Sequence, residues 1–344
     1  MEIDVMVGAG TWSDHADMAE RLEAAGFSGM VFTETSEVPW MKIAAAATAA
    51  PTLHFATGIA VAFPRSPMIS AAVAWELAGN TGGRFRLGLG SQVKAHVVRR
   101  YGAEFAPPAA RLRDYVAAVK ACLRAFAGEE RLAFEGDFYR LDFLPPAWSP
   151  RRHGYGDVPV DISAVGPGMT RVAGEVADGV HVHPLHSMHY IEHRLLPGLA
   201  EGAARADRDV SDLDLIVPVF AAPGDTHEER EPLVRRARSQ IAFYGSTPNY
   251  AFQFDDLGFE GTTDTLNRLM RAGELDSMAA TIDDEMLAHY AIVCRWDELA
   301  DRLIERYRAT TARIVMYLTE DSIRRDPGTL GPWGEVARAV RAAG

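Results

Sequence analysis

Short apolar runs alternate with longer amphipathic stretches along the whole chain. This alternation predicts parallel β-strands connected by α-helices. After the first strand, for example, Ser13 or Asp14 is placed to cap a helix that runs to Ala25, and Gly26 is placed to end it. The predicted strands cover residues 3–8, 29–33, 53–61, 85–90, 158–164, 179–183, 213–219 and 312–318.

Eight strands, each followed by a helix, predict a closed (β/α)8 TIM barrel, an α/β fold that forms one domain over residues 1–344. An open dinucleotide-binding sheet is less consistent with the sequence, because the turn at residues 8–12 lacks the third glycine of a GxGxxG motif. Two stretches are too long for ordinary loops and are predicted to be insertions. Residues 128–157 are expected to form a hairpin and an extended segment, and residues 244–293 two or three short helices.

Composition narrows the class of protein. The 344 residues are 48% hydrophobic and 24% charged, as in a globular protein with a large core. The net charge is −12 and the cations are scattered, which argues against a nucleic acid or an anionic membrane as partner. Cys122 and Cys294 lie in separate apolar stretches and are expected to be buried thiols of a cytoplasmic protein.

Catalytic side chains of a TIM barrel lie at the carboxyl ends of its strands, so position filters the candidates. Glu34 follows the second strand and is suited either to contact a cofactor or transfer a proton, or to cap a helix. Trp40 is suited to form an aromatic wall for a planar ligand or simply to pack at a helix start. His54 begins the third strand and is therefore expected to be structural.

Glycines mark three further strand ends. Gly58 interrupts an apolar strand, which indicates a bulge or a close approach to a ligand. The glycines of residues 88–90 precede Ser91 and Gln92 and would leave room for a flat group. Residues 166–169 (Gly-Pro-Gly-Met) open a predicted helix, where free amides favour a phosphate, although a plain turn would have the same sequence.

The sixth strand ends in His181-Val182-His183. Alternate strand residues share a face, so this pair could bind a metal ion, as in a metal-dependent hydrolase. No matching set of carboxylates or lysines is evident at the other strand ends, so no metal is predicted. His183 remains a candidate to contact the substrate.

Four segments together resemble the luciferase-like monooxygenase superfamily, and within it the oxidoreductases that use coenzyme F420. They are residues 25–32 (AGFSGMVF), residues 57–67 with Thr-Gly-Ile and Pro-Arg-Ser-Pro, residues 83–90 (GRFRLGLG), and residues 166–179 from Gly-Pro-Gly-Met to Ala-Asp-Gly. The resemblance extends over almost the whole chain.

The resemblance implies roles for particular residues. A non-prolyl cis peptide between Gly58 and Ile59 would form a bulge behind the deazaflavin ring. From their own positions at the barrel end or in the second insertion, Glu34, His183 and Tyr244 are the candidates for proton transfer, and Trp40, with aromatic residues 243, 244 and 250, would shape an apolar pocket for an uncharged substrate. The coenzyme would be contacted by Ser91 and Gln92 and its phosphate held by Gly166, Pro167, Gly168 and Met169.

The chain departs from this family at two positions. Relatives that oxidise sugar phosphates or alcohols have His after the acidic residue, where this chain has Thr35, and the carboxylate after the fourth strand is replaced by Val93. A sugar-phosphate dehydrogenase is therefore not expected. An FMN-dependent monooxygenase fed by a separate reductase and a non-catalytic flavin-binding protein remain alternatives. The resemblance also implies a homodimer or a larger even homo-oligomer.

Overall fold

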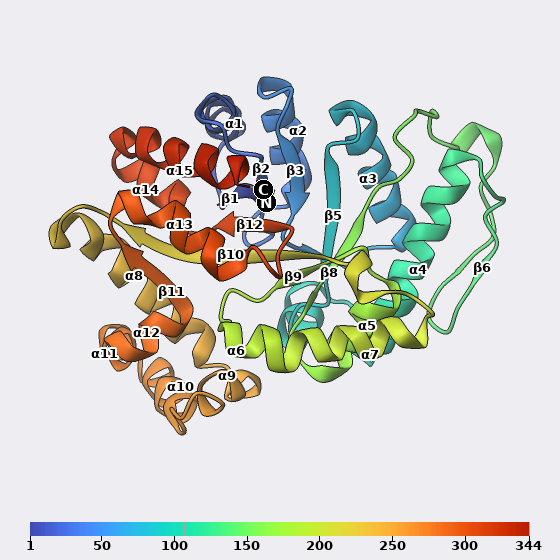
Figure 1. Ribbon diagram of the computed structural model, residues 1–344. Helices are drawn as coiled ribbons and strands as arrows, with labels where there is room; N and C mark the ends of the chain where they lie inside the picture. The colour runs from blue at the N-terminus through green and yellow to red at the C-terminus, as the bar shows by residue number, and fades with distance from the viewer. Residues whose placement is uncertain (106, 344) are drawn as a thin grey trace.

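The computed structural model describes residues 1–105 and 107–343, and its centre is a closed barrel of eight parallel strands (Figure 1). Neighbouring strands pair in chain order, and the last strand closes the barrel by pairing with the first. The predicted TIM barrel is confirmed. Its strands are β1 (Glu2–Val7), β2 (Gly29–Phe32), β3 (His54–Thr57) with β4 (Ala60–Val61), β5 (Phe85–Gly90), β8 (Val160–Ala164), β9 (Gly179–Val182), β10 (Asp214–Pro223) and β12 (Arg313–Met316).

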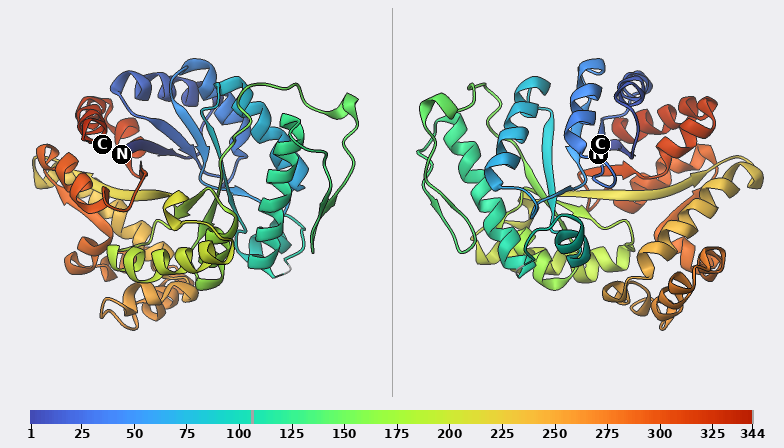
Figure 2. Two further views of the ribbon diagram at one scale, coloured as in Figure 1. Left: turned by 45° about the vertical axis from the view of Figure 1, so that its right-hand side comes forward. Right: turned by 180° about the vertical axis from the view of Figure 1, so that it is seen from behind.

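Helices surround the barrel and bury their apolar faces on it. The last helix packs beside the first, so that the two termini of the chain lie close together (Figures 1 and 2). The surrounding helices are α1 (Trp12–Ala25), α2 (Pro39–Ala49), α3 (Pro67–Thr81), α4 (Pro108–Ala127), α5 (Pro167–Val176), α6 (Met188–Tyr190), α7 (Leu196–Arg205), α8 (His227–Gly245), α13 (Trp296–Tyr307), α14 (Thr319–Arg325) and α15 (Leu330–Ala342).

Helix α1 begins slightly earlier than the sequence predicts. Its cap is Thr11, whose hydroxyl accepts the amide of Asp14 while the Asp14 carboxylate accepts the amide of Thr11. Asp14 is therefore the third helical residue of a capping box, and the prediction of Ser13 or Asp14 as the cap was wrong. Gly26 ends the helix with φ 97°, as predicted.

The predicted strand 53–61 is two strands. It breaks at the Gly58–Ile59 peptide bond, which is cis, and β4 then continues the pairing with β5. A continuous strand was wrong here because the pattern of apolar residues continues through the break. Strand β10, by contrast, runs four residues past its predicted end and pairs there with β11 (Ala291–Cys294), which the sequence did not predict as a strand.

The two predicted insertions lie on opposite sides of the barrel (Figures 1 and 2). Residues 128–157 contain the expected hairpin, β6 (Phe134–Glu135) with β7 (Arg140–Leu141), and an extended segment. The second insertion holds more helices than the two or three predicted. These are α9 (Phe252–Asp255), α10 (Thr262–Ala272), α11 (Leu275–Thr281) and α12 (Asp284–Tyr290), preceded by the 3-10 turn η5 (Pro248–Tyr250).

Ion pairs hold the amino-terminal end of the barrel together. Arg86 of β5 donates to both carboxylate oxygens of the fully buried Asp161 of β8 (2.7 and 2.9 Å) and to Asp214 at the start of β10 (2.8 Å). Arg313 of β12 makes the equivalent contact with Asp4 of β1. In a TIM barrel, residues at this end stabilise the fold, and the catalytic residues lie at the opposite, carboxyl end of the strands.

Cys122 and Cys294 are buried free thiols, as predicted, and burial raises the pKa of each, to about 12 and about 11. Over residues 1–105 and 107–343, no helix is both long enough and apolar enough to cross a bilayer.

Candidate active site at the carboxyl end of the barrel

The bulge after β3 forms one wall of the barrel mouth. A Cβ on Gly58 would lie 2.4 Å from the Val31 side chain, so only glycine fits at this position. Ile59 is half-buried, and its side chain fills the space above Gly90 of β5, where a Cβ would come within 2.7 Å of it. The glycines of β5 were expected to leave room for a flat ligand. Gly90 instead makes room for the chain's own Ile59, and Gly88 for His181 and Thr57.

Glu34 is buried and fully engaged by its neighbours. Its Oε2 accepts the backbone N–H of Val61 (2.7 Å) and an N–H of Arg65 (2.8 Å), and its Oε1 accepts a second N–H of Arg65 (2.5 Å). Arg65 also donates to the carbonyl of Val61 (2.7 Å). The carboxylate thus accepts three hydrogen bonds from two residues and anchors β4, and these contacts favour positioning over proton transfer.

Trp40 and Thr35 flank this ion pair. The Arg65 guanidinium lies 5.6 Å from the centre of the half-buried Trp40 ring and holds that ring at the mouth. Thr35 is exposed, and its carbonyl accepts a hydrogen bond from Arg100. This strand end therefore presents the aromatic ring of Trp40 and the hydroxyl of Thr35.

Ser91 and Gln92 follow β5 at the mouth, and both are half-buried. Gln92 has a positive φ of 58°, a conformation that non-glycine residues seldom adopt. Its side-chain Oε1 accepts the amide of Val93 (2.9 Å), so the side chain folds back on its own turn.

The turn of residues 166–169 begins α5 with backbone amides that have no side-chain cap. Gly166 is the cap residue, and a Cβ there would meet no atom within 4 Å. Gly168 lies beside Ala109, so the first turn of α4 is adjacent to the first turn of α5. Two parallel helices thus bring their positive ends together at an open glycine turn, an arrangement that suits a phosphate group. The residues present fit a phosphate-bearing coenzyme.

His183 lies in a cluster of tyrosines contributed by separate elements. Its ring centre is 4.9 Å from that of Tyr244 on α8 and 4.6 Å from that of Tyr250 in η5. The hydroxyls of Tyr244 and Tyr317, which follows β12, are 2.6 Å apart. All four side chains are only partly buried, so the cluster borders open space at the mouth. The structure brings the predicted His183 and Tyr244 together and adds Tyr317, which the sequence analysis missed.

His181 and His183 have different neighbours. His181 is buried inside the barrel beside Gly58 and Gly88, with its Nε2 3.9 Å from Asp161. His183 contacts the tyrosine cluster instead. Among the described residues no group of three or more His, Cys, Asp or Glu side chains is arranged to hold a metal ion.

Lys42 and Glu320, which the sequence analysis also missed, together fix the residue after β1, Gly8. The buried Lys42 donates to the carbonyl of Gly8 (3.0 Å), and Glu320 accepts the amide of the same glycine (2.9 Å). His15, also buried, lies beside these two residues. A clue was present in the sequence, because Lys42 is the one charged residue in an otherwise apolar helix. The partner Glu320 lies 278 positions away, and no local pattern connects the two.

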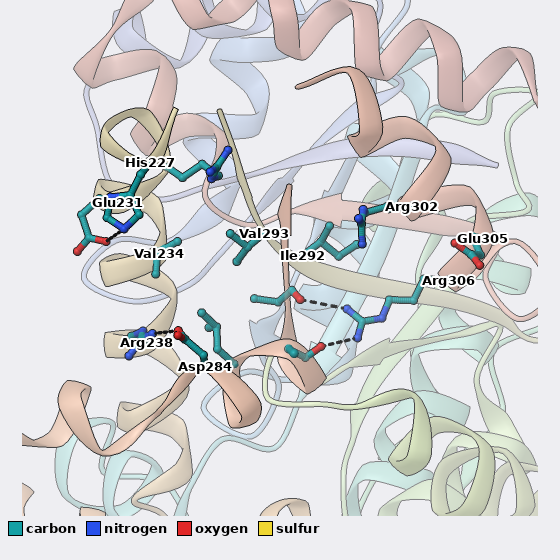
Figure 3. A pocket seen from close by; sticks show the side chains of 14 residues that line it. His227, Glu231, Val234, Arg238, Asp284, Ile292, Val293, Arg302, Glu305 and Arg306 are labelled. Atoms are coloured by element: carbon teal, nitrogen blue, oxygen red, sulfur yellow. Dashed lines mark hydrogen bonds and ion pairs between the residues drawn. The ribbon is translucent and has the colours of Figure 1, made fainter. Parts of the chain in front are cut away.

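A cavity of about 660 Å³ lies outside the barrel mouth, between α8, α12, β11 and α13 (Figure 3). Two of its arginines, Arg238 and Arg306, bind backbone carbonyls of the chain itself. Arg306 donates to the carbonyls of Ala288 (2.9 Å) and Ala291 (3.3 Å), and Arg238 pairs with Asp284 and donates to the carbonyl of Ile282. None of the predicted site residues lines this cavity. It is the seam where the helical insertion joins the barrel.

Comparison with known proteins agrees with this description. The family profile described as Luciferase-like monooxygenase matches residues 1–313. An uncharacterized protein of Mycobacterium tuberculosis is 38% identical over 300 residues, which cover 87% of this chain and 88% of the relative. A 5,10-methylenetetrahydromethanopterin reductase of Archaeoglobus fulgidus is 24% identical over 270 residues, which cover 77% of this chain and 76% of the relative.

Among solved structures, the coenzyme F420 dependent tetrahydromethanopterin reductase of Methanopyrus kandleri superposes with a TM-score of 0.77 at 17% identity. The match covers 97% of each chain and concerns the fold.

Proposed function

This chain belongs to the luciferase-like monooxygenase family, and from that membership we propose that it uses coenzyme F420 to transfer a hydride to or from a small uncharged organic molecule. The observation that carries the proposal is the open glycine turn at the start of α5, at the same end of the barrel as the Gly58–Ile59 bulge. The name of the Methanopyrus kandleri reductase, which includes coenzyme F420, supports F420 as the coenzyme.

Each part of the site has a role in this proposal. The coenzyme supplies the hydride chemistry. Gly166 and Gly168 would hold its phosphate through backbone amides. Met169, whose N–H donates to the carbonyl of Gly166 (3.0 Å), closes the turn, and Pro167, which has no N–H, fixes the start of the helix. Ile59 would support the ring, and Ser91 and Gln92 would border it at the end of β5.

The substrate would lie against Trp40 and the tyrosine cluster. Two cations beside Trp40 and the end of β1 are already neutralised, Arg65 by Glu34 and Lys42 by Glu37 at 3.5 Å. A charged substrate group would therefore find no free partner among these residues, and burying an unpaired charge is costly. This supports an uncharged substrate.

His183 and Tyr244, and not Glu34, are the candidates for proton transfer in this proposal. The Glu34 carboxylate is occupied by three hydrogen bonds from Val61 and Arg65, whereas His183 and Tyr244 border the open mouth. Glu34 is in this proposal a positioning residue that fixes β4 beside the ring.

We also propose that the chain forms a homodimer or a larger even assembly. Met41 on α2 and Ile69 on α3 are each 55% exposed, and these two helices pack side by side. Analytical ultracentrifugation tests the assembly. The protein is expected to sediment at twice its chain mass or an even multiple, and a monomer at all concentrations would contradict this.

The direct test of function is a side-by-side titration of the purified protein with F420 and FMN, followed by assays of turnover. Binding of F420 with hydride transfer supports the proposal. Preference for reduced FMN with consumption of oxygen would instead identify a monooxygenase, and tight binding without turnover a flavin-binding protein.

A further inference from the structure

We propose that His183 and the Tyr244–Tyr317 pair form a neutral hydrogen-bond-donating site for an uncharged oxygen acceptor of the carbonyl type on the substrate. The inference rests on the proposed function, because it names the chemistry of the substrate that the same barrel mouth would receive. It assigns to Tyr317 a role in binding and to His183 the role of a donor.

The tautomer of His183 is fixed by its own loop. Its Nδ1 lies 3.1 Å from the backbone nitrogen of Leu185, whose N–H can only donate. Nδ1 is therefore the acceptor, and in the neutral ring the proton is carried by Nε2. The flanking rings of Tyr244 and Tyr250 restrict how the imidazole can turn. His183 thus presents one N–H donor in a defined orientation.

The surroundings of His183 keep it neutral. The titratable groups packed against it are Tyr244 from α8, Tyr250 from η5 and His186 from its own loop. Burial lowers the pKa of His183 to about 3 and that of His186 to about 4, and it raises the pKa of both tyrosines. A ring with such a low pKa donates a hydrogen bond at neutral pH but carries no positive charge.

The tyrosine pair supplies a second donor. Of two hydroxyls 2.6 Å apart, one donates to the other, and the accepting hydroxyl keeps its own proton for a third group. Burial raises the pKa of both phenols, so the pair stays protonated. Tyr317 is anchored by its backbone N–H, which donates to the carbonyl of Val219 (3.0 Å), and by the Phe220 ring at 4.9 Å.

Two neutral donors with aromatic bodies select the ligand by its chemistry. A carbonyl oxygen has two lone pairs and accepts two hydrogen bonds without bringing a charge into the site. A carboxylate would lose its hydration without gaining a cation, and an ammonium would lose its hydration without gaining an anion. Donors fixed on a carbonyl oxygen also bind more strongly when negative charge develops on that oxygen during hydride addition.

The tautomer is tested on coenzyme-free protein labelled with 15N-histidine. NMR spectra of the wild type and of His183→Gln identify the His183 signals. The expected result is a neutral ring protonated at Nε2 at every pH from 7 down to 5. An imidazolium at pH 6, or a proton on Nδ1, would overturn the proposal.

Ligand chemistry is tested on the same protein with three rings of equal size: cyclohexanone, cyclohexanecarboxylate and cyclohexylammonium. Cyclohexanone is expected to shift the His183 Nε2 signal and to bind more tightly than the two charged rings. Tyr317→Phe and Tyr244→Phe are each expected to weaken ketone binding about 3- to 10-fold, as the loss of one hydrogen bond predicts. Tyr155→Phe, on the 128–157 insertion, is the matched control and should leave ketone binding unchanged.

Several results would overturn the inference. They are tighter binding of either charged ring, no shift on addition of ketone, or equal effects of Tyr155→Phe and Tyr317→Phe. If Tyr317→Phe weakened F420 binding and left ketone binding intact, the donors would serve the coenzyme and the inference would be wrong. Because the ketone experiment needs no coenzyme, failure of the F420 proposal is read separately from its outcome.

Discussion

Glu34 and Arg65 together hold both backbone groups of a single residue, Val61. The carboxylate accepts the N–H of Val61 at 2.7 Å, and the guanidinium donates to its carbonyl at 2.7 Å while pairing with the carboxylate. Val61 ends β4, directly after the Gly58–Ile59 bulge. An ion pair at the barrel mouth thus fixes the strand that would border the coenzyme ring.

Replacing Glu34 tests whether it positions β4 or transfers a proton. Glu34→Gln leaves the Arg65 guanidinium, whose side chain is 16% exposed, without its counter-charge. Unfolding in urea should show a loss of about 3 kcal/mol or more, as for other buried pairs that lose one partner. The double variant Glu34→Gln/Arg65→Met should lose less than the sum of the single losses.

The control is Glu20→Gln, which removes an exposed carboxylate on α1 and should change stability little. A Glu34→Gln protein as stable as the wild type but without turnover would identify Glu34 as the acid or base and would contradict the positioning role.

Gly166→Ala tests the phosphate turn. The backbone φ at this position is −84°, and the added methyl group would meet no atom within 4 Å, so the folded protein should be as stable as the wild type or slightly more so. The methyl group would, however, occupy the open space in front of the α5 amides. F420 binding should weaken about 10-fold or more in a fluorescence titration, which corresponds to about 1.4 kcal/mol. Gly331→Ala, also in open space but on α15, should bind F420 normally; equal affinity of all three proteins would contradict the assignment.

Buried histidines should make the protein sensitive to acid. Burial lowers the pKa of His181 and of His186 to about 4, whereas in the unfolded chain both titrate near 6.5. The unfolded state therefore binds more protons below pH 6.5, and stability is lost as the pH falls from there towards 4. Each of these histidines should cost about 2 kcal/mol between pH 7 and pH 5.

Urea unfolding at a series of pH values measures this loss. His186→Gln should flatten the dependence between pH 7 and pH 5, and His227→Gln, whose side chain is 83% exposed, should not. A stability independent of pH over this range would show that these rings are not buried as neutral groups.

The sequence predicts elements whose cause is local. The range of β5 was predicted to the residue, and the hairpin around residues 134–141 was found where expected, because apolar runs and turn residues determine both. The break of β3 at Gly58 and the cap of α1 at Thr11 were placed less well. At the β3 break, Gly58 packs against Val31 of another strand, and the cap Thr11 lies two residues before Ser13, the earlier of the two predicted caps.

In the candidate site, too, features with a local cause were predicted and contacts between distant residues were not. The glycine turn before α5 was recognised because its glycines and the start of the helix are features of the local sequence. The partners of Glu34 were not foreseen, since Arg65 lies 31 residues away, and Tyr317 joins Tyr244 across 73 residues. Such pairings are created by closure of the barrel, which no local pattern encodes.

The most direct test of the central claim is the equilibrium binding of F420 and of FMN to the same preparation, measured side by side by fluorescence. The predicted result is saturable binding of F420 with at least 10-fold weaker binding of FMN, which corresponds to about 1.4 kcal/mol of discrimination. Equal or tighter binding of FMN would contradict F420 as the coenzyme, and binding of neither would contradict the assignment of the barrel mouth as a coenzyme site.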